Sequence, residues 1–120
     1  MPQQELDLNL LRQLNTQPEA SQRKLAENLG VSVGKLNYCL RALVDRGWVK
    51  ANNFRRSDNK WAYAYLLTPS GLSAKFRLTS HFLRRKELEF EELQTQISAL
   101  RTELSAPNDQ AAVPIARKSR

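Results

Sequence analysis

Apolar residues in the first third of the chain recur at intervals of three and four positions, which is the spacing of one face of an α-helix. Leucines between positions 6 and 14 follow this spacing and predict a first helix that ends near Asn15. A second apolar stripe predicts a helix over residues 22–29. Ser21 is a suitable N-cap for this second helix, and Gly30 follows it at the point where a left-handed residue commonly ends a helix.

A third apolar stripe predicts another helix, which begins after the N-cap Ser32 and ends at Gly47. Its apolar positions are Leu36, Cys39, Leu40, Leu43 and Val44. Two further apolar stretches, residues 48–54 and 61–67, are joined by a polar, turn-prone link, and the second stretch alternates between two faces. We therefore predict a β-hairpin after the third helix.

The last apolar pattern predicts one long helix over residues 69–104, with Thr68 as its N-cap. Apolar side chains in its second half repeat with the seven-residue period of a coiled coil, which Lys86 interrupts at one position. The side chains that we expect to mediate dimerisation are Leu83, Phe90, Leu93, Ile97, Leu100 and Leu104. The alternative is a helix that breaks near residues 84–86 and folds back over its own domain. Residues 105–120 lack usable periodicity and are predicted to form a disordered tail.

The chain is basic, and its charge is unevenly distributed. Nineteen Lys and Arg residues against twelve Asp and Glu residues give a net charge of +7 and a pI near 10.0. Residues 51–86 contain eight basic residues and one acidic residue, Asp58, whereas residues 87–105 contain five acidic residues and one basic residue. This distribution favours a nucleic-acid-binding face around the predicted hairpin, followed by a segment kept away from phosphate. A generally basic, soluble protein is the simpler interpretation.

The sequence lacks the residue patterns of an enzyme or of a metal site. One cysteine, Cys39, and one histidine, His81, cannot supply an intrachain disulfide or a four-ligand zinc site. The sequence contains no catalytic acid/base pair, nucleophile motif or glycine-rich phosphate loop, so we expect neither catalysis nor a cofactor. There is no apolar run of about eighteen residues and no signal-peptide pattern at the N-terminus, which favours a cytoplasmic protein without a membrane span.

The order of helix, tight turn, helix and basic hairpin is that of a winged helix-turn-helix, whose second helix enters the major groove of DNA. On this helix Lys35 could donate to guanine and Asn37 could pair with adenine. Tyr38 or Arg41 could bind phosphate. The alternative is a helix face that is only solvated.

Basic residues also flank the tip of the predicted hairpin, where Arg55, Arg56 and Lys60 could lie over phosphates or reach into a minor groove. The alternative is a charged turn that keeps the sheet edge soluble. Residues at the start of the second helix could donate to phosphate or act as a helix cap, namely Ser21, Gln22 and Arg23. Aromatic residues of the hairpin could stack on single-stranded bases, but packing between sheet and helices is favoured for Trp48, Trp61, Tyr63 and Tyr65.

The chain resembles the winged helix-turn-helix of bacterial MarR-type transcriptional regulators, in particular the small MarR-like regulators associated with exopolysaccharide gene clusters. The resemblance covers about residues 5–80 and is carried by LAENLGVSVGKLNYCLRALVDRGWVK, a basic hairpin and LTPSGLSAK. It implies that Arg55 and Arg56 lie on the wing. It also implies that the DNA-reading helix carries Ser32, Lys35, Asn37, Tyr38 and Arg41.

Regulators of this type generally carry an additional N-terminal helix, which takes part in dimerisation and frames an effector pocket. Here the first predicted helix starts almost at Met1, which makes a small-molecule effector doubtful. Dimerisation is then expected to rest on the C-terminal helix.

We therefore predict a mainly α fold with a small β-hairpin. A winged helix-turn-helix DNA-binding domain at residues 1–68 is expected to precede a long coiled-coil helix at residues 69–104. The expected function is a dimeric, sequence-specific regulator of transcription that binds double-stranded DNA. The alternative is a winged-helix module that binds protein and docks in a larger complex through its long helix. An acidic block would suit a basic partner of such a module, and it comprises Glu87, Glu89, Glu91 and Glu92.

Overall fold

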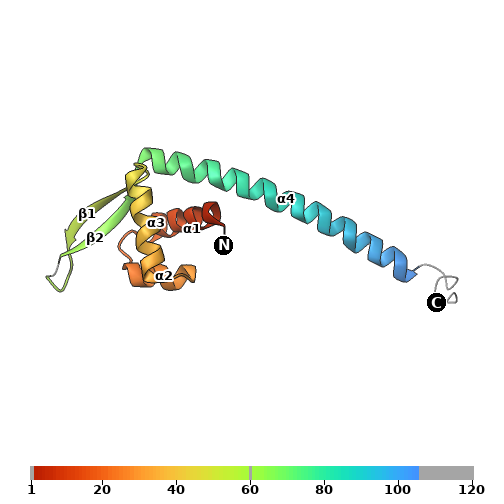
Figure 1. Cartoon of the computed structure of the whole chain (residues 1–120), viewed down its shortest axis with the longest axis horizontal. Coiled ribbons are helices and arrows are strands. Elements are labelled where there is room, and N and C mark those ends of the chain that lie inside the picture. The colour runs from red at the N-terminus through yellow and green to blue at the C-terminus, as the bar shows by residue number, and fades with distance from the viewer. Residues whose placement is uncertain (1, 60, 106–120) are drawn as a thin grey trace. The chain divides into compact units, whose positions relative to one another are not determined.

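The computed structural model describes residues 2–59 and 61–105 of the 120-residue chain. The elements in chain order are α1 (Gln3–Thr16), α2 (Gln22–Leu29), α3 (Val33–Asp45), β1 (Val49–Arg55), β2 (Trp61–Leu67) and α4 (Pro69–Ser105) (Figure 1). The predicted fold class, mainly α with a small β-hairpin and a long last helix, is confirmed. The chain divides into two compact units, of which the first ends at Phe82 and the second begins at Leu83. Apart from Ser105, the predicted tail lies outside the described residues.

The first unit is organised around leucines of α1, α2 and α3, whose apolar stripes are buried against one another. Val44 was predicted to belong to the α3 stripe, but it is 37% exposed because it lies at the edge of that stripe. Cys39, as expected for a small apolar side chain, is buried within the core. The residues of this core are Leu6, Leu10, Leu11, Leu14, Leu25, Ala26, Leu29, Leu36, Cys39, Leu40, Leu43 and Val49.

Local capping fixes the turn between α2 and α3. The hydroxyl of Ser21 accepts a hydrogen bond from the backbone N–H of Lys24 over 3.1 Å, and Ser32 accepts one from Lys35 over 3.0 Å. Both predicted N-caps are thereby confirmed. Gly30 ends α2 with a φ of +69°, a left-handed conformation that glycine adopts without steric cost. These caps define where α3 begins and hence which of its residues form its first turn.

The wing is an antiparallel hairpin in which Val49 pairs with Leu67 at one end and Arg55 pairs with Trp61 at the other. Figure 1 shows the hairpin extending from the side of the three helices. The backbone N–H of Tyr65 donates to the carbonyl of Pro18 over 3.0 Å, so the connection between α1 and α2 flanks the second edge of β2. This contact attaches the base of the wing to the helical core.

The first turns of α4 pack closely on the end of the helix-turn-helix. Thr68 caps α4 as predicted, because its hydroxyl accepts a hydrogen bond from the N–H of Gly71 over 3.0 Å. A Cβ atom on Gly71 would lie 1.9 Å from the carbonyl oxygen of Trp48, so this helix position requires glycine. Ala74 is fully buried one turn later, and Leu78 packs against the core. α4 continues to Ser105 with no break at residues 84–86.

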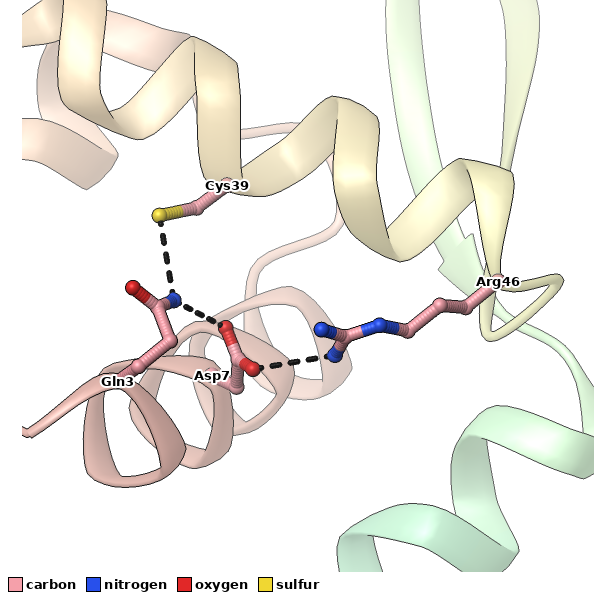
Figure 2. A network of polar contacts seen from close by, with 4 residues as sticks. All are labelled: Gln3, Asp7, Cys39 and Arg46. Carbon is pink, nitrogen blue, oxygen red and sulfur yellow. Dashed lines mark hydrogen bonds and ion pairs between the residues drawn. The ribbon is translucent and has the colours of Figure 1, made fainter.

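A polar network connects α1 to α3 (Figure 2). The carboxylate of Asp7 is 6% exposed and accepts a hydrogen bond from Gln3 Nε2 over 2.8 Å. Its other oxygen pairs with Arg46 Nη1 over 3.2 Å. Gln3 Nε2 also lies 3.6 Å from the sulfur of Cys39. The network therefore holds both the middle and the C-terminal end of α3 against α1, and it supplies the partner that a buried carboxylate requires.

Candidate nucleic-acid interface

The outer face of α3 is exposed, because the opposite face carries the buried leucines. Lys35, Tyr38 and Arg41 all lie on this outer face, and 70% of the Tyr38 surface is accessible to solvent. The ammonium group of Lys35 lies 5.9 Å from the ring centroid of Tyr38. A shallow depression on the same face is lined by Gly34, Asn37, Tyr38, Arg41, Ala42 and Asp45. α3 thus brings four of the sequence-predicted residues onto one surface.

Asn37 and Gln22 have a different environment from the exposed residues around them. Both side chains are half-buried, and Asn37 Nδ2 donates to Gln22 Oε1 over 3.2 Å. Gln22 Nε2 in turn donates to the hydroxyl of Tyr65 over 3.3 Å. The amide of Gln22 is therefore bonded to protein at both ends. Sequence reasoning assigned Gln22 to phosphate or to a helix cap, and no periodic or local signal indicated its contact with Tyr65.

The remaining predicted residues at the helix starts are exposed. Ser21 and Ser32 both serve as N-caps, which occupies one acceptor position of each hydroxyl. Arg23 lies in the first turn of α2 beside Ser21, and its side chain is exposed. A helix N-terminus has backbone N–H groups that lack helical partners, which makes this corner suited to an anion.

At the wing tip, both arginines make local contacts. Arg55 Nη1 donates to Asn59 Oδ1 over 2.8 Å, and Arg56 Nη2 lies 3.4 Å from Asp58 Oδ2. The Arg56 pair is well exposed, and such pairs contribute only about 0–1 kcal/mol, so a phosphate could replace Asp58 as its partner. Lys60 lies outside the described residues. A second depression joins the wing tip to the start of α2 and is lined by Glu19, Ser21, Phe54, Arg55, Arg56, Ser57 and Ala62.

Two of the aromatic residues at the hairpin pack against the core and are not free to form a platform for base stacking. Trp48 is half-buried against the core, with the guanidinium carbons of Arg46 and Arg77 at 5.0 and 5.8 Å from its ring centroid. Tyr65 also packs against the core, while Tyr63 is exposed and stacks on Tyr65 with ring centroids 6.2 Å apart. Packing is therefore confirmed for Trp48 and Tyr65. The side chain of Trp61 lies outside what the structure describes.

The second unit presents a different surface. Every residue of α4 from Leu83 to Ser105 is exposed, including the apolar side chains of the seven-residue pattern. The exposed fractions of these apolar residues range from 38% at Ile97 to 87% at Leu104. Lys86, which interrupts the pattern, pairs with Glu89 over 3.2 Å on the same helix.

Within residues 2–59 and 61–105, no cluster of three or more His, Cys, Asp and Glu side chains is arranged to hold a metal ion. No helix among these residues combines the length and the apolar character that crossing a bilayer requires.

Comparison with known proteins places the first unit in a familiar class. Residues 3–50 match the family described as "Winged helix-turn-helix DNA-binding". No curated protein sequence matches the chain. Among solved structures, the PcaV transcriptional regulator from Streptomyces coelicolor is similar with a TM-score of 0.63 and 21% identity, over 82% of this chain and 71% of that one.

Two other solved structures have the same fold. The Staphylococcus aureus transcription regulator MepR is similar with a TM-score of 0.55 and 17% identity, over 84% of this chain and 78% of that one. A MarR/EmrR family regulator from Acinetobacter sp. ADP1 gives a TM-score of 0.55 and 18% identity, over 84% and 75% of the two chains. The winged helix-turn-helix fold that the resemblance to MarR-type regulators implied is confirmed.

Proposed function

We propose that this protein is a transcriptional regulator that binds double-stranded DNA sequence-specifically, as a dimer, with α3 in the major groove. The observation that carries the proposal is the two-sided character of α3. One face is locked into the core by Leu36, Leu40 and Leu43, and the other exposes Lys35, Tyr38 and Arg41 beside a basic wing. A rigid helix with a polar, cationic outer face fits the width of the major groove.

Apart from Gln22, the predicted residues of α2 and α3 then have roles that their positions support. Lys35, in the first turn of α3, donates to a guanine edge, while Asn37 pairs with an adenine. Tyr38 and Arg41, one and two turns into the helix, contact phosphates at the groove wall. The exposed start of α2 adds contacts to the backbone from Ser21 and Arg23, and Ser32 does so from the start of α3.

The wing contributes affinity more than sequence preference. Arg55 and Arg56 lie at the far end of the hairpin from the core, where they reach the adjacent phosphates or minor groove, and Lys60 would add a third charge. Replacing both arginines by Ala should weaken binding to every DNA sequence. It should also reduce the slope of log K against log salt by about 0.9 for each phosphate that the protein no longer neutralises.

The exposure of the second half of α4 supports dimerisation through this helix. A helix whose apolar side chains are all exposed gains little stability from its own chain, and isolated helices are marginal in water. The seven-residue spacing is the one at which two copies of a helix bury each other's apolar seam. The seam consists of Leu83, Phe90, Leu93, Ile97, Leu100 and Leu104.

The test is selection of binding sites from random DNA duplexes by the full chain, followed by affinity measurements in several salt concentrations. We expect a two-fold symmetric site whose half-sites are about 10 base pairs apart or a multiple of that. The variant carrying Lys35→Ala and Asn37→Ala should lose sequence preference, whereas Lys50→Ala, which removes an exposed charge from β1, should keep it. Salt-insensitive or absent DNA binding would instead favour a protein-binding module.

A further inference from the structure

A chain of side-chain hydrogen bonds joins the recognition helix α3 to the wing. Asn37 of α3 donates to Gln22 of α2, and Gln22 donates to Tyr65 of β2, over 3.2 and 3.3 Å. All three side chains are half-buried, and Tyr65 also packs against the core. Forming the helices or the strand in which these residues lie does not require such side-chain contacts.

The contacts couple the orientations of two side-chain amides, because each amide must present a donor where the other presents an acceptor. An amide can rotate by a half-turn, which exchanges its donor and its acceptor. With Gln22 Nε2 turned towards the Tyr65 hydroxyl, Gln22 presents its oxygen to α3. A rotated Asn37 would then bring two oxygens together, so Asn37 keeps its nitrogen on the side of Gln22.

In this orientation Asn37 still has the donor and the acceptor that are needed to read one base. Nδ2 carries two protons, of which Gln22 accepts one, and Oδ1 is a separate acceptor. Adenine reading needs one amide N–H for N7 and one carbonyl oxygen for the N6 amino group. Asn37 lines the depression on the outer face of α3 together with Gly34, Tyr38 and Arg41, where a base edge would lie.

We propose that Gln22 and Tyr65 are positioning residues, which orient the Asn37 amide to read an adenine. Base preference at one position of the operator therefore depends on a hydroxyl of the wing strand. The inference rests on the proposed function, and it changes the role of Gln22 from a phosphate contact to a support for base reading.

The experiment compares variants of the full chain on a site selected by the wild-type protein and on duplexes with each base pair of that site replaced. Asn37→Ala removes the reading group, Gln22→Met removes both hydrogen bonds of Gln22 at similar side-chain length, and Tyr65→Phe removes only the hydroxyl. Tyr63→Phe is the matched control, because it deletes the same atom from the exposed tyrosine two residues away on β2.

We expect Asn37→Ala and Gln22→Met to lose discrimination at the same single base pair, where the wild-type preference should be about ten- to a hundredfold. Tyr65→Phe should lose part of it, and Tyr63→Phe should keep all of it. Gln22→Glu is the rescue variant: its carboxylate can accept from both Asn37 and the Tyr65 hydroxyl, so the preference should persist although the added charge lowers affinity for all sequences.

A uniform loss of affinity in Gln22→Met, or a loss at a different base pair from Asn37→Ala, would overturn the positioning role while leaving the proposed function intact. Full retention of the preference in both Gln22→Met and Tyr65→Phe would do the same. If the wild-type protein selects no DNA sequence, the proposed function itself fails. Thermal unfolding of each variant identifies any loss of fold, and Tyr65→Phe with Gln22→Glu decides the question should Gln22→Met not fold.

Discussion

α3 and the second half of α4 carry apolar stripes of similar regularity, yet their burial is opposite. In α3, Leu36, Leu40 and Leu43 are at most 1% exposed. In α4, Leu93 and Ile97 are 53% and 38% exposed. Periodicity therefore specifies that a stripe exists, and the rest of the chain determines whether anything covers it. The stripe of α3 is covered by its own domain, whereas that of α4 is left exposed by its own chain.

The two regions also differ in the charge that surrounds the stripe. The face of α3 opposite its stripe carries Lys35 and Arg41, which suits phosphate and base edges. The second unit carries an exposed acidic block, which would be repelled by DNA. Its residues are Glu87, Glu89, Glu91 and Glu92. The difference supports the proposed division of roles, in which the first unit binds nucleic acid and the second unit mediates dimerisation.

Ile97→Asp should have the largest effect on this division. A carboxylate placed in the proposed seam would be buried without a partner, at a cost of about 3–5 kcal/mol to the dimer. Light scattering or sedimentation of the full chain should then report a monomer. Binding to a two-half-site operator should fall by about a hundredfold or more, because the second half-site contact is no longer intramolecular.

The control is Thr95→Asp, which adds the same charge to an exposed position two residues away, outside the seven-residue seam. It should leave the dimer unchanged. A dimer that persists in Ile97→Asp would remove α4 as the dimer interface and would make its bare stripe the surface for a different protein.

Leu40→Ala probes the buried stripe in the same way. Removing a leucine side chain from a packed core costs about 2–5 kcal/mol, so the free energy of unfolding of the first unit should fall by that amount. Val44→Ala, at the exposed edge of the same helix, should cost less than about 1 kcal/mol. Denaturant unfolding followed by Trp fluorescence measures both. Equal losses in the two variants would contradict the burial difference within α3.

Much of the first unit could be predicted from local sequence signals. Ser21 and Gly30 bound α2 at its observed residues, 22–29, because an N-cap hydroxyl and a left-handed glycine act on the adjacent turn. Thr68 marks the start of α4 for the same reason. Helix periodicity also predicted the buried leucines, and it was wrong for Val44 because an edge position depends on the neighbouring element.

Contacts between residues distant in sequence could not be predicted. Asp7 and Arg46 are 39 positions apart, and nothing in the spacing of either helix indicates that they pair. The contact of Gln22 with Tyr65 depends equally on how α2 and β2 meet. The sequence around Gly71 likewise gives no sign of its close approach to the Trp48 carbonyl, because that contact exists only in the folded chain.

Gly71→Ala should have the next largest effect, a loss of stability. The added methyl group would collide with backbone and not with a movable side chain. Overpacking of this kind costs about 1–3 kcal/mol, measured as a lower free energy of unfolding. Gly34→Ala is the matched control in the first turn of α3, where the nearest atom to a Cβ is 4.0 Å away. That variant should be as stable as the wild type or up to about 1 kcal/mol more stable. Destabilisation of similar size in both variants would refute the close contact between α4 and Trp48.

Lys86→Leu should have the smallest effect, and it acts in the opposite direction. Lys86 occupies a position of the seam that is otherwise apolar, and it pairs with Glu89 of its own helix over 3.2 Å. The exposed pair contributes little, whereas a leucine would extend the apolar seam between Leu83 and Phe90. If each buried leucine adds about 1 kcal/mol, the dissociation constant of the dimer should fall by roughly tenfold or more.

Lys86→Arg, which keeps the charge, should leave that constant nearly unchanged in sedimentation equilibrium. Weaker association of Lys86→Leu would mean that Lys86 lies outside the interface or stabilises the dimer through its charge. The seven-residue seam defined by Phe90 and Ile97 would then be assigned in the wrong register.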